Sequence, residues 1–176
     1  SNRLYVWPKD NENLVQSQKI TQSFRSFAIG LGRNVSYVTI EGFVLRRTTG
    51  DFSDFGEGTI INVAGGNHHI TIRENEITQA MGGRDNIIDF RETNDIVIEK
   101  NHISEITGKK RGILLSGVNL NVTDNLIESI SGTALYCSGC MNSIIVNNTV
   151  AGLGSSHANS ISVYQGSQNV LIAGNI

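Results

Sequence analysis

Short alternations of apolar and polar residues recur along this chain, and each of them leads to an asparagine. One copy runs from Ile70 through Ile72 to Asn75 and continues into Ile77. The asparagines of successive copies are separated by 26, 24, 23 and 27 residues and are Asn75, Asn101, Asn125, Asn148 and Asn175. Self-similarity at a period of this length is typical of a solenoid, in which each repeat forms one coil.

Each repeat contains two further apolar segments. One precedes the alternation and begins at Ile60, Ile87, Ile113, Ala134 and Ile161, and the other follows the asparagine around Ile77, Ile103, Ile127 and Val150. Three such short strands cannot pair within one coil, but each can pair with the same strand of the next coil, about 4.8 Å away. Parallel crossovers are right-handed almost without exception. The pattern therefore predicts an all-β chain that forms a right-handed, single-stranded parallel β-helix of about five to six coils.

The recurring asparagines predict a structural ladder rather than a chemical site. A sharp bend between two strands favours the left-handed backbone region, which asparagine tolerates. Stacked side-chain amides can then hydrogen-bond to one another along the solenoid and satisfy their buried polar groups. A second set lies before the same strands and is interpreted as turn residues: Asn67, Asn94, Asn119, Asn142 and Asn169.

The 176 residues are expected to form one domain, with an irregular first coil over 1–33 and repeats over 34–176. Because the chain opens in sheet-like sequence and ends inside a repeat, we expect it to be part of a longer solenoid. The net charge of −2 gives no basic field for nucleic acid. No apolar run approaches the roughly 18 residues of a membrane helix, so membrane insertion is not expected. Open strand edges on the end coils predict end-to-end self-association.

The asparagine repeat resembles that of the right-handed parallel β-helices of the pectate-lyase-like superfamily. The segments 4–10 and 38–43 are also similar to the start of the repeat region in polysaccharide-active bacterial β-helix proteins. The resemblance implies a secreted, periplasmic or cell-surface protein that acts on an acidic glycan as a lyase or glycoside hydrolase. Lyases, hydrolases, epimerases and adhesins share this fold. The alternative is a non-catalytic solenoid with a glycan-binding, adhesin-like or structural role, and the known catalytic motifs of these enzymes are absent from the chain.

In enzymes of this type the substrate groove runs along one sheet and the loops that lead into it. The outward positions of the strands that begin at Ile60 to Ile161 form one row of Asn62, Asp89, Leu114, Tyr136 and Ser162, and a second row of Ala64, Arg91, Ser116, Ser138 and Tyr164. The candidate catalytic residues are Asp89, Arg91, Tyr136 and Lys110. The candidate substrate-binding residues are Arg84, Lys109, Arg111, His157 and Tyr164.

These residue types suit two reactions. A lyase needs a cation to neutralise the uronate, a base and an acid, for which Arg91, Lys110 and Tyr136 are available. A hydrolase needs two carboxylates about 5–9.5 Å apart, for which Asp89 can pair with Asp85 or Glu57. Asp85 and Glu57 are also candidate calcium ligands through their hard oxygens. The alternative is that the basic loop is solvated and that the acidic and basic residues form surface ion pairs.

Two further motifs have structural interpretations. His68 and His69 lie in a turn beside Asn67 and are interpreted as turn residues rather than metal ligands. Cys137 and Cys140 form a C-x-x-C motif without the context of a redox motif or the second pair of a zinc site. Either Cys137 packs inward as a small apolar residue, or the two cysteines form a local disulfide in an exported protein.

Overall fold

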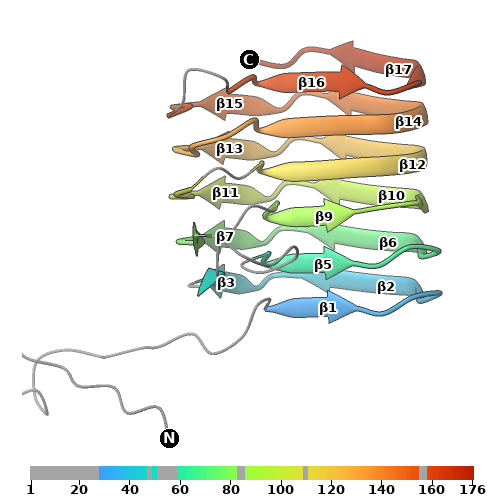
Figure 1. Ribbon diagram of the computed structural model, residues 1–176, viewed down its shortest axis with the longest axis horizontal. Coiled ribbons are helices and arrows are strands. Elements are labelled where there is room, and N and C mark those ends of the chain that lie inside the picture. The colour runs from blue at the N-terminus through green and yellow to red at the C-terminus, as the bar shows by residue number, and fades with distance from the viewer. Residues whose placement is uncertain (1–27, 47–48, 51–58, 83–85, 109–110, 155–157) are drawn as a thin grey trace, which may run out of the picture.

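The computed structural model describes residues 28–46, 49–50, 59–82, 86–108, 111–154 and 158–176. Over these residues the chain forms seventeen strands and no helix. The strands wind in three segments per coil, and the coils stack along one axis (Figure 1). Every strand pair in the described residues is parallel.

The three segments of the coils form three stacks of strands. The first arm consists of β1 (Ile29–Leu31), β5 (Ile61–Val63), β9 (Ile88–Phe90), the first parts of β12 (Ile113–Thr123) and β14 (Leu135–Val146), and β16 (Ile161–Tyr164). The second arm consists of β2 (Ser36–Glu41), β6 (His68–Arg73), β10 (Thr93–Glu99), the later parts of β12 and β14, and β17 (Gln168–Ala173). The third arm consists of β3 (Val44–Arg46), β7 (Glu76–Thr78), β11 (His102–Ser104), β13 (Leu126–Glu128) and β15 (Thr149–Ala151), and β4 (Thr49–Gly50) pairs with β8 (Met81–Gly82) beside it.

The alternation of the repeats sets the register of these stacks. Ile96 on β10 lies opposite Ile70 on β6 and Leu120 on β12, and all three side chains are buried. Inward-facing isoleucine, leucine and valine from all three arms fill a single core along the axis. Because β-branched side chains pack well on a pleated surface, the repeat sequence is suited to this stacking. The predicted right-handed parallel β-helix is confirmed.

The predicted asparagine ladder is also confirmed. The Nδ2 of Asn75 donates to the Oδ1 of Asn101 at 3.0 Å, and the same bond continues from Asn101 to Asn125 at 3.0 Å. It then joins Asn125 to Asn148 at 2.9 Å and Asn148 to Asn175 at 3.0 Å. Each of these Oδ1 atoms also accepts the backbone N–H of the preceding ladder residue, so the ladder satisfies buried main-chain groups as well.

The backbone explanation given for the ladder was wrong. The left-handed residue of each bend is the one before the asparagine, with φ values of 53°, 53°, 55° and 56° at Glu74, Lys100, Asp124 and Asn147. The ladder asparagines themselves are not among the described residues with positive φ. The left-handed residue makes the bend, and the asparagine that follows it faces the interior. The asparagine is therefore selected for its amide and not for its tolerance of positive φ.

The second asparagine set is confirmed as turn residues only in part. Asn119, Asn142 and Asn169 take left-handed conformations with φ of 56°, 49° and 53°. In the two preceding coils the equivalent left-handed residues are His69 and Asp95. Asn94 lies opposite His68 in the pairing of β6 with β10, so it is one residue before the left-handed position. The set was therefore aligned wrongly in these coils. Asn67 is buried and stabilises its turn by donating to the carbonyl oxygens of Gly32 at 2.8 Å and Ala64 at 2.7 Å.

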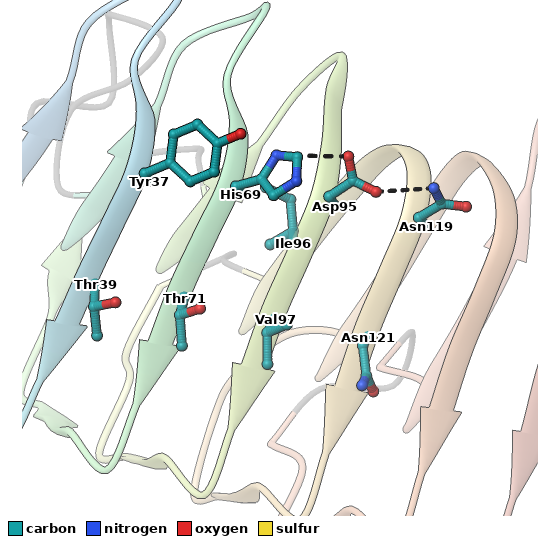
Figure 2. A pocket seen from close by; sticks show the side chains of 9 residues that line it. All are labelled: Tyr37, Thr39, His69, Thr71, Asp95, Ile96, Val97, Asn119 and Asn121. Atoms are coloured by element: carbon teal, nitrogen blue, oxygen red, sulfur yellow. Dashed lines mark hydrogen bonds and ion pairs between the residues drawn. The ribbon is translucent and has the colours of Figure 1, made fainter.

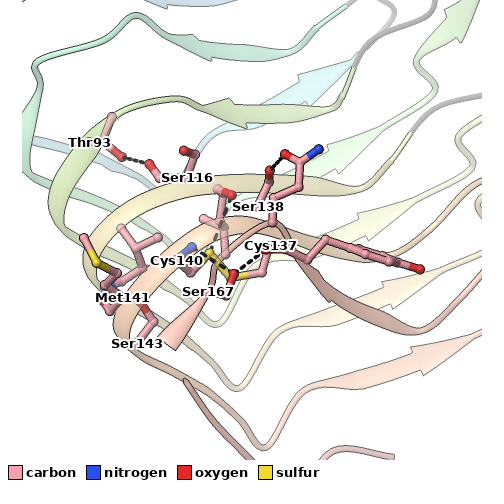
Figure 3. The surroundings of a disulfide bond; sticks show 12 residues. Thr93, Ser116, Cys137, Ser138, Cys140, Met141, Ser143 and Ser167 are labelled. Carbon is pink, nitrogen blue, oxygen red and sulfur yellow. Dashed lines mark hydrogen bonds between the residues drawn. A yellow bond between two sulfur atoms is a disulfide. The ribbon is translucent and has the colours of Figure 1, made fainter. Parts of the chain in front are cut away.

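Cys137 and Cys140 form a disulfide inside β14 (Figure 3), which decides between the two interpretations of this motif. Their Cα atoms are 5.8 Å apart and both side chains are buried. The register between β12 and β14 shifts at this point, from Leu115 opposite Cys137 to Gly117 opposite Cys140. The disulfide therefore closes a β-bulge. Disulfides form and persist in oxidising compartments, so this bond is typical of a protein from such a compartment.

Candidate functional sites

Asp89 lies on the first arm, where the sequence places it. It faces Asn62 on one side and Leu114 on the other, and Leu114 in turn faces Tyr136, so this outward row is present as predicted. Asp89 is only 5% exposed. Its Oδ1 accepts from Arg91 Nε at 3.0 Å, and its Oδ2 accepts from Arg91 Nη2 at 2.9 Å and from Asn86 Nδ2 at 2.9 Å.

This arrangement engages both oxygens of the Asp89 carboxylate. A bidentate pair with arginine is geometrically specific and among the stronger protein hydrogen bonds. A proton or a metal ion that bound to Asp89 would have to displace these donors. The contacts therefore suit an anchoring role for Asp89 and Arg91 better than proton transfer. The catalytic role of the two residues remains a prediction.

Three of the other candidates come together on the same face. The Cζ of Arg111 lies 3.9 Å from the centroid of the Tyr136 ring, and the Tyr136 and Tyr164 rings stack with centroids 5.5 Å apart and an interplanar angle of 23°. Arg111 and Tyr164 belong to the coils on either side of Tyr136. Because these neighbours occupy the ring faces of Tyr136, its hydroxyl and ring edge are the parts that can meet a ligand. Tyr164 is 51% exposed.

The remaining candidates lie outside the described residues, and the predictions for them stay open. They are Lys110, Arg84, Lys109, His157, Asp85 and Glu57.

The second arm carries a depression that the sequence interpretation missed. It has a volume of about 560 Å³ and is open to solvent on one side. Figure 2 shows its lining side chains, which come from β2, β6, β10 and β12: Tyr37, Thr39, His69, Thr71, Asp95, Ile96, Val97, Asn119 and Asn121. Thr39, Thr71, Val97 and Asn121 face one another across the strands as one outward row. We call this depression the second-arm groove.

One rim of the second-arm groove is a column of left-handed residues. Tyr37, His69, Asp95 and Asn119 have φ values of 59°, 55°, 53° and 56°. The Tyr37 and His69 rings stack with centroids 4.7 Å apart. Next along the column, His69 Nδ1 lies 3.8 Å from Asp95 Oδ2, and Asn119 Nδ2 donates to Asp95 Oδ1 at 2.9 Å (Figure 2). The repeated turn thus stacks the four side chains in order along the solenoid.

His68 adds a second imidazole to this rim. Its Nδ1 lies 2.8 Å from the Nδ1 of His69, and the two rings are nearly perpendicular, at 81°. At least one of these nitrogens is unprotonated, because two N–H groups cannot point at each other at this distance. The side chains of His69 and Asp95 are 47% and 39% exposed, so the pair is accessible from solvent.

An ion-pair row lies at the other end of the same strands. Arg73 Nη2 donates to Glu41 Oε2 at 2.9 Å, and Arg73 Nη1 lies 4.0 Å from Glu99 Oε1. The hydrogen bond with Glu41 and the charge of Glu41 raise the pKa of Arg73 above its ordinary value, with smaller contributions from Glu74 and Glu99. Arg73 is therefore charged at any pH at which the protein is handled.

The family comparison has one result. A family model described as "Periplasmic copper-binding protein (NosD)" matches residues 11–176. The chain belongs to the NosD family. No curated protein and no solved structure matches the chain at a significant level.

Membership of the NosD family bears out the resemblance to right-handed β-helices of the pectate-lyase-like superfamily. It supports a periplasmic β-helix protein of bacterial type, and the disulfide agrees with that compartment. It does not support membership of a polysaccharide-active family. Within the described residues, no helix is long and apolar enough to cross a membrane.

The described residues offer copper a limited set of ligands. They contain no group of three or more histidine, cysteine, aspartate and glutamate residues that could hold a metal ion. Cys137 and Cys140 are bonded to each other. The pair of His68 and His69 remains, and imidazole nitrogen is a preferred ligand of copper. The residues present thus fit copper with two protein nitrogens, whereas nothing in the described residues or in the family supports the predicted calcium.

Proposed function

We propose that this NosD protein binds copper in the periplasm through the imidazoles of His68 and His69. The family description supports the choice of metal. The observation that carries the proposal is the 2.8 Å approach of the two Nδ1 atoms at the rim of the second-arm groove.

The spacing of the two nitrogens suits a shared metal ion. Imidazole nitrogens bind a divalent ion such as zinc at about 2.0–2.1 Å, so two of them at right angles around one ion are about 2.9 Å apart. In the structure the two rings share a hydrogen bond between their Nδ1 atoms. A bound metal ion would take the place of this hydrogen bond, with each neutral ring offering Nδ1 to the ion and carrying its proton on Nε2.

The backbone explains how two consecutive residues can present their side chains to one ion. Neighbouring side chains in a strand point to opposite faces of the sheet. His69 takes the left-handed conformation, with φ of 55°, at the start of β6. This turn brings its ring beside that of His68 instead of across the sheet.

Calorimetric titration of the protein with Cu(II) tests the proposal. His68→Asn and His69→Asn should each weaken binding at least about tenfold, since each removes one of two nitrogen ligands. His102→Ala is the matched control, because His102 lies on the third arm and contacts Glu128 at 2.8 Å. Wild-type protein that binds no copper, or equal loss in the control, would refute the proposal.

Polysaccharide binding on the first arm is a second candidate function. The stack of Arg111, Tyr136 and Tyr164 favours it, since a guanidinium and two phenol edges can contact the carboxylate and hydroxyl groups of an acidic glycan. Lyase or hydrolase activity is the further step, and the engaged carboxylate of Asp89 gives it no support.

A panel of acidic and neutral polysaccharides, with and without calcium, separates these alternatives. Ultraviolet absorbance of unsaturated uronate reports a lyase, and new reducing ends report a hydrolase. Retardation in gels that contain glycan, without any product, indicates binding alone. Arg111→Gln should abolish this retardation and His102→Ala should not, whereas equal migration of all three proteins would exclude the first arm as the glycan site.

A further inference from the structure

The rim of the second-arm groove carries an exposed aromatic ring at a position that disfavours it. Tyr37 has φ of 59°, in the left-handed region that asparagine, aspartate and glycine tolerate best. One face of its ring stacks on His69, but 76% of Tyr37 is exposed, so burial compensates little for this conformation. Unfavourable backbone conformations of this kind are concentrated at functional sites. The open part of the Tyr37 ring is available to stack on a ligand in the groove.

A carboxylate oxygen is available in the middle of the same rim (Figure 2). Asp95 uses Oδ1 to accept the amide of Asn119 at 2.9 Å. Its Oδ2 lies 3.8 Å from His69 Nδ1, which is too long for a hydrogen bond, and the Asp95 side chain is 39% exposed. Among the described residues that line the groove there is no lysine or arginine. The groove therefore favours a ligand with a positive charge and repels an anionic one.

We infer that the second-arm groove binds a short oligosaccharide of amino sugars, with an ammonium group at Asp95 and a sugar ring on Tyr37. This inference goes beyond the copper function proposed above and does not depend on it. The site is also separate from the first-arm stack, where Arg111 suits a glycan of the opposite charge.

The floor of the groove supports a ligand rich in hydroxyl groups. Thr39, Thr71 and Asn121 belong to the outward row that also contains Val97. Their hydroxyl and amide groups both donate and accept hydrogen bonds, as sugar hydroxyls do. The Oδ1 of Asn121 is buried without a hydrogen-bond partner in the described residues, and rotation of the amide would bring this acceptor to the ligand. The row crosses four strands and spans about 14 Å, a length that suits an oligosaccharide better than a single sugar.

The strands beneath the groove argue against a peptide as the ligand. β6 pairs with β2 and β10, and β12 pairs with β10 and β14, so the middle strands have no free edge. An extended peptide that binds to a sheet adds a strand at such an edge. The volume of about 560 Å³ lies within the range of small-molecule sites. The open side of the groove allows a longer glycan to continue into solvent.

Two linear tetrasaccharides that differ only at nitrogen test the inference. The glucosamine tetramer carries free amines, whereas the N-acetylglucosamine tetramer carries neutral acetamides on the same backbone. In calorimetric titration at about pH 6, where sugar amines are largely charged, the amine tetramer should bind about fivefold more tightly, as expected for a partly exposed ion pair. A chelator in the buffer keeps copper out of the measurement. A tetramer of galacturonic acid should not compete for the groove.

Four variants separate the contributions of charge, ring and floor. Asp95→Asn should make the affinities for the two tetramers equal without abolishing binding. Asp124→Asn is the matched control, because Asp124 is an exposed aspartate with φ of 55° that does not line the groove. Tyr37→Asn keeps a residue suited to the left-handed turn, removes the ring and should weaken both tetramers about tenfold. Thr71→Val removes a floor hydroxyl with little change of shape and should weaken both to a smaller extent.

Each outcome supports or overturns one part of the inference. Equal affinity of the wild-type protein for the two tetramers, or an unchanged ratio in Asp95→Asn, would overturn the role of the charge. Spermidine that binds as tightly as the amine tetramer would show that the groove selects a cation and not a sugar. Binding that is unchanged in both Tyr37→Asn and Thr71→Val would place the glycan elsewhere, and no binding to the wild-type protein would reject the inference. None of these results bears on copper, which His68→Asn and His69→Asn test separately.

Discussion

Replacement of Asn125 by alanine should destabilise the solenoid more than any exposed asparagine substitution. Asn125 is buried in the middle of the ladder. Its Oδ1 accepts the backbone N–H and the side-chain amide of Asn101, both at 3.0 Å. Its Nδ2 lies within hydrogen-bond distance of Ile98 O at 2.9 Å, Thr123 O at 3.0 Å and Asn148 Oδ1 at 2.9 Å.

The size of the destabilisation depends on which of these partners keep a hydrogen bond after the substitution. The amide of Asn101 still donates to the carbonyl oxygens of Ile72 and Glu99, and the Oδ1 of Asn148 still accepts the N–H of residue 125. The backbone N–H of Asn101 loses its acceptor, the Oδ1 of Asn125. A buried N–H group without a hydrogen-bond partner costs about 1–3 kcal/mol. Together with the weakened contacts to the other partners, the free energy of unfolding should fall by about 3 kcal/mol.

Urea unfolding followed by far-ultraviolet circular dichroism measures this loss. Asn142→Gly is the matched control, because Asn142 is exposed, has φ of 49° and accepts one bond from Asn169. Glycine adopts this conformation freely, so the control should change the free energy of unfolding by less than about 0.5 kcal/mol. A loss below about 1 kcal/mol for Asn125→Ala, or one equal to the control, would show that the ladder is not needed to satisfy the buried amides.

Three further predictions concern other parts of the fold. Gly117→Ala should cost more stability than Gly166→Ala: an added Cβ would lie 1.7 Å from Thr93 O at Gly117, whereas it meets nothing within 4 Å at Gly166, although both have positive φ. Equal urea midpoints would contradict the close approach of the coils. Joint replacement of Cys137 and Cys140 by alanine should lower the free energy of unfolding by about 2 kcal/mol, because the disulfide closes a short loop, and detection of free thiols in the denatured, unreduced wild type would remove the premise. Glu41→Gln should change the free energy of unfolding by the same small amount at every pH from about 6 to about 10. The pKa of Arg73 is raised, so the contribution of the Glu41–Arg73 pair is lost only as the pH rises above that range. A difference in stability between the two proteins that grows with pH within the range would refute this.

The fold could be predicted because its periodicity appears in two independent residue types. The ladder asparagines mark one corner of each coil, and the isoleucines that flank them mark the faces that turn inward. Ile70, Ile96 and Leu120 could be aligned from the asparagines alone, and the strands pair in that register. In a solenoid a residue contacts its counterpart in the next coil, so sequence spacing translates directly into spatial neighbours.

The backbone at the corners could not be read with the same accuracy. Lys100 and Asn101 are both polar and adjacent at one bend, and sequence alone does not say which of them takes the left-handed conformation. The structure assigns it to Lys100, since Asn101 must face inward for its amide to reach the ladder. The sequence interpretation therefore assigned positive φ to the asparagine, which has the stronger preference for it, although the asparagine faces inward and hydrogen-bonds in the ladder.

The sites were harder to predict for two reasons. The stack of Tyr136 and Tyr164 joins residues that were assigned to different outward rows, because large rings reach diagonally across neighbouring coils. The second-arm groove lies on the sheet that carries the asparagine alternation, whereas the variation among loops directed attention to the first arm.

The histidine pair was interpreted as turn residues because it lies beside Asn67. The structure places His69 at the left-handed position of the turn, and the equivalent residues in later coils are Asp95 and Asn119, which also have positive φ. Two of these three residue types are common in left-handed turns, and histidine is tolerated there as well. Asparagine at position 69 should therefore keep the turn and remove only the imidazole. Alanine should also strain the turn, by about 1 kcal/mol. Loss of copper binding in His69→Asn with an unchanged urea midpoint would assign the effect to the ligand, whereas a midpoint as low as that of His69→Ala would show that the histidine stabilises the turn itself.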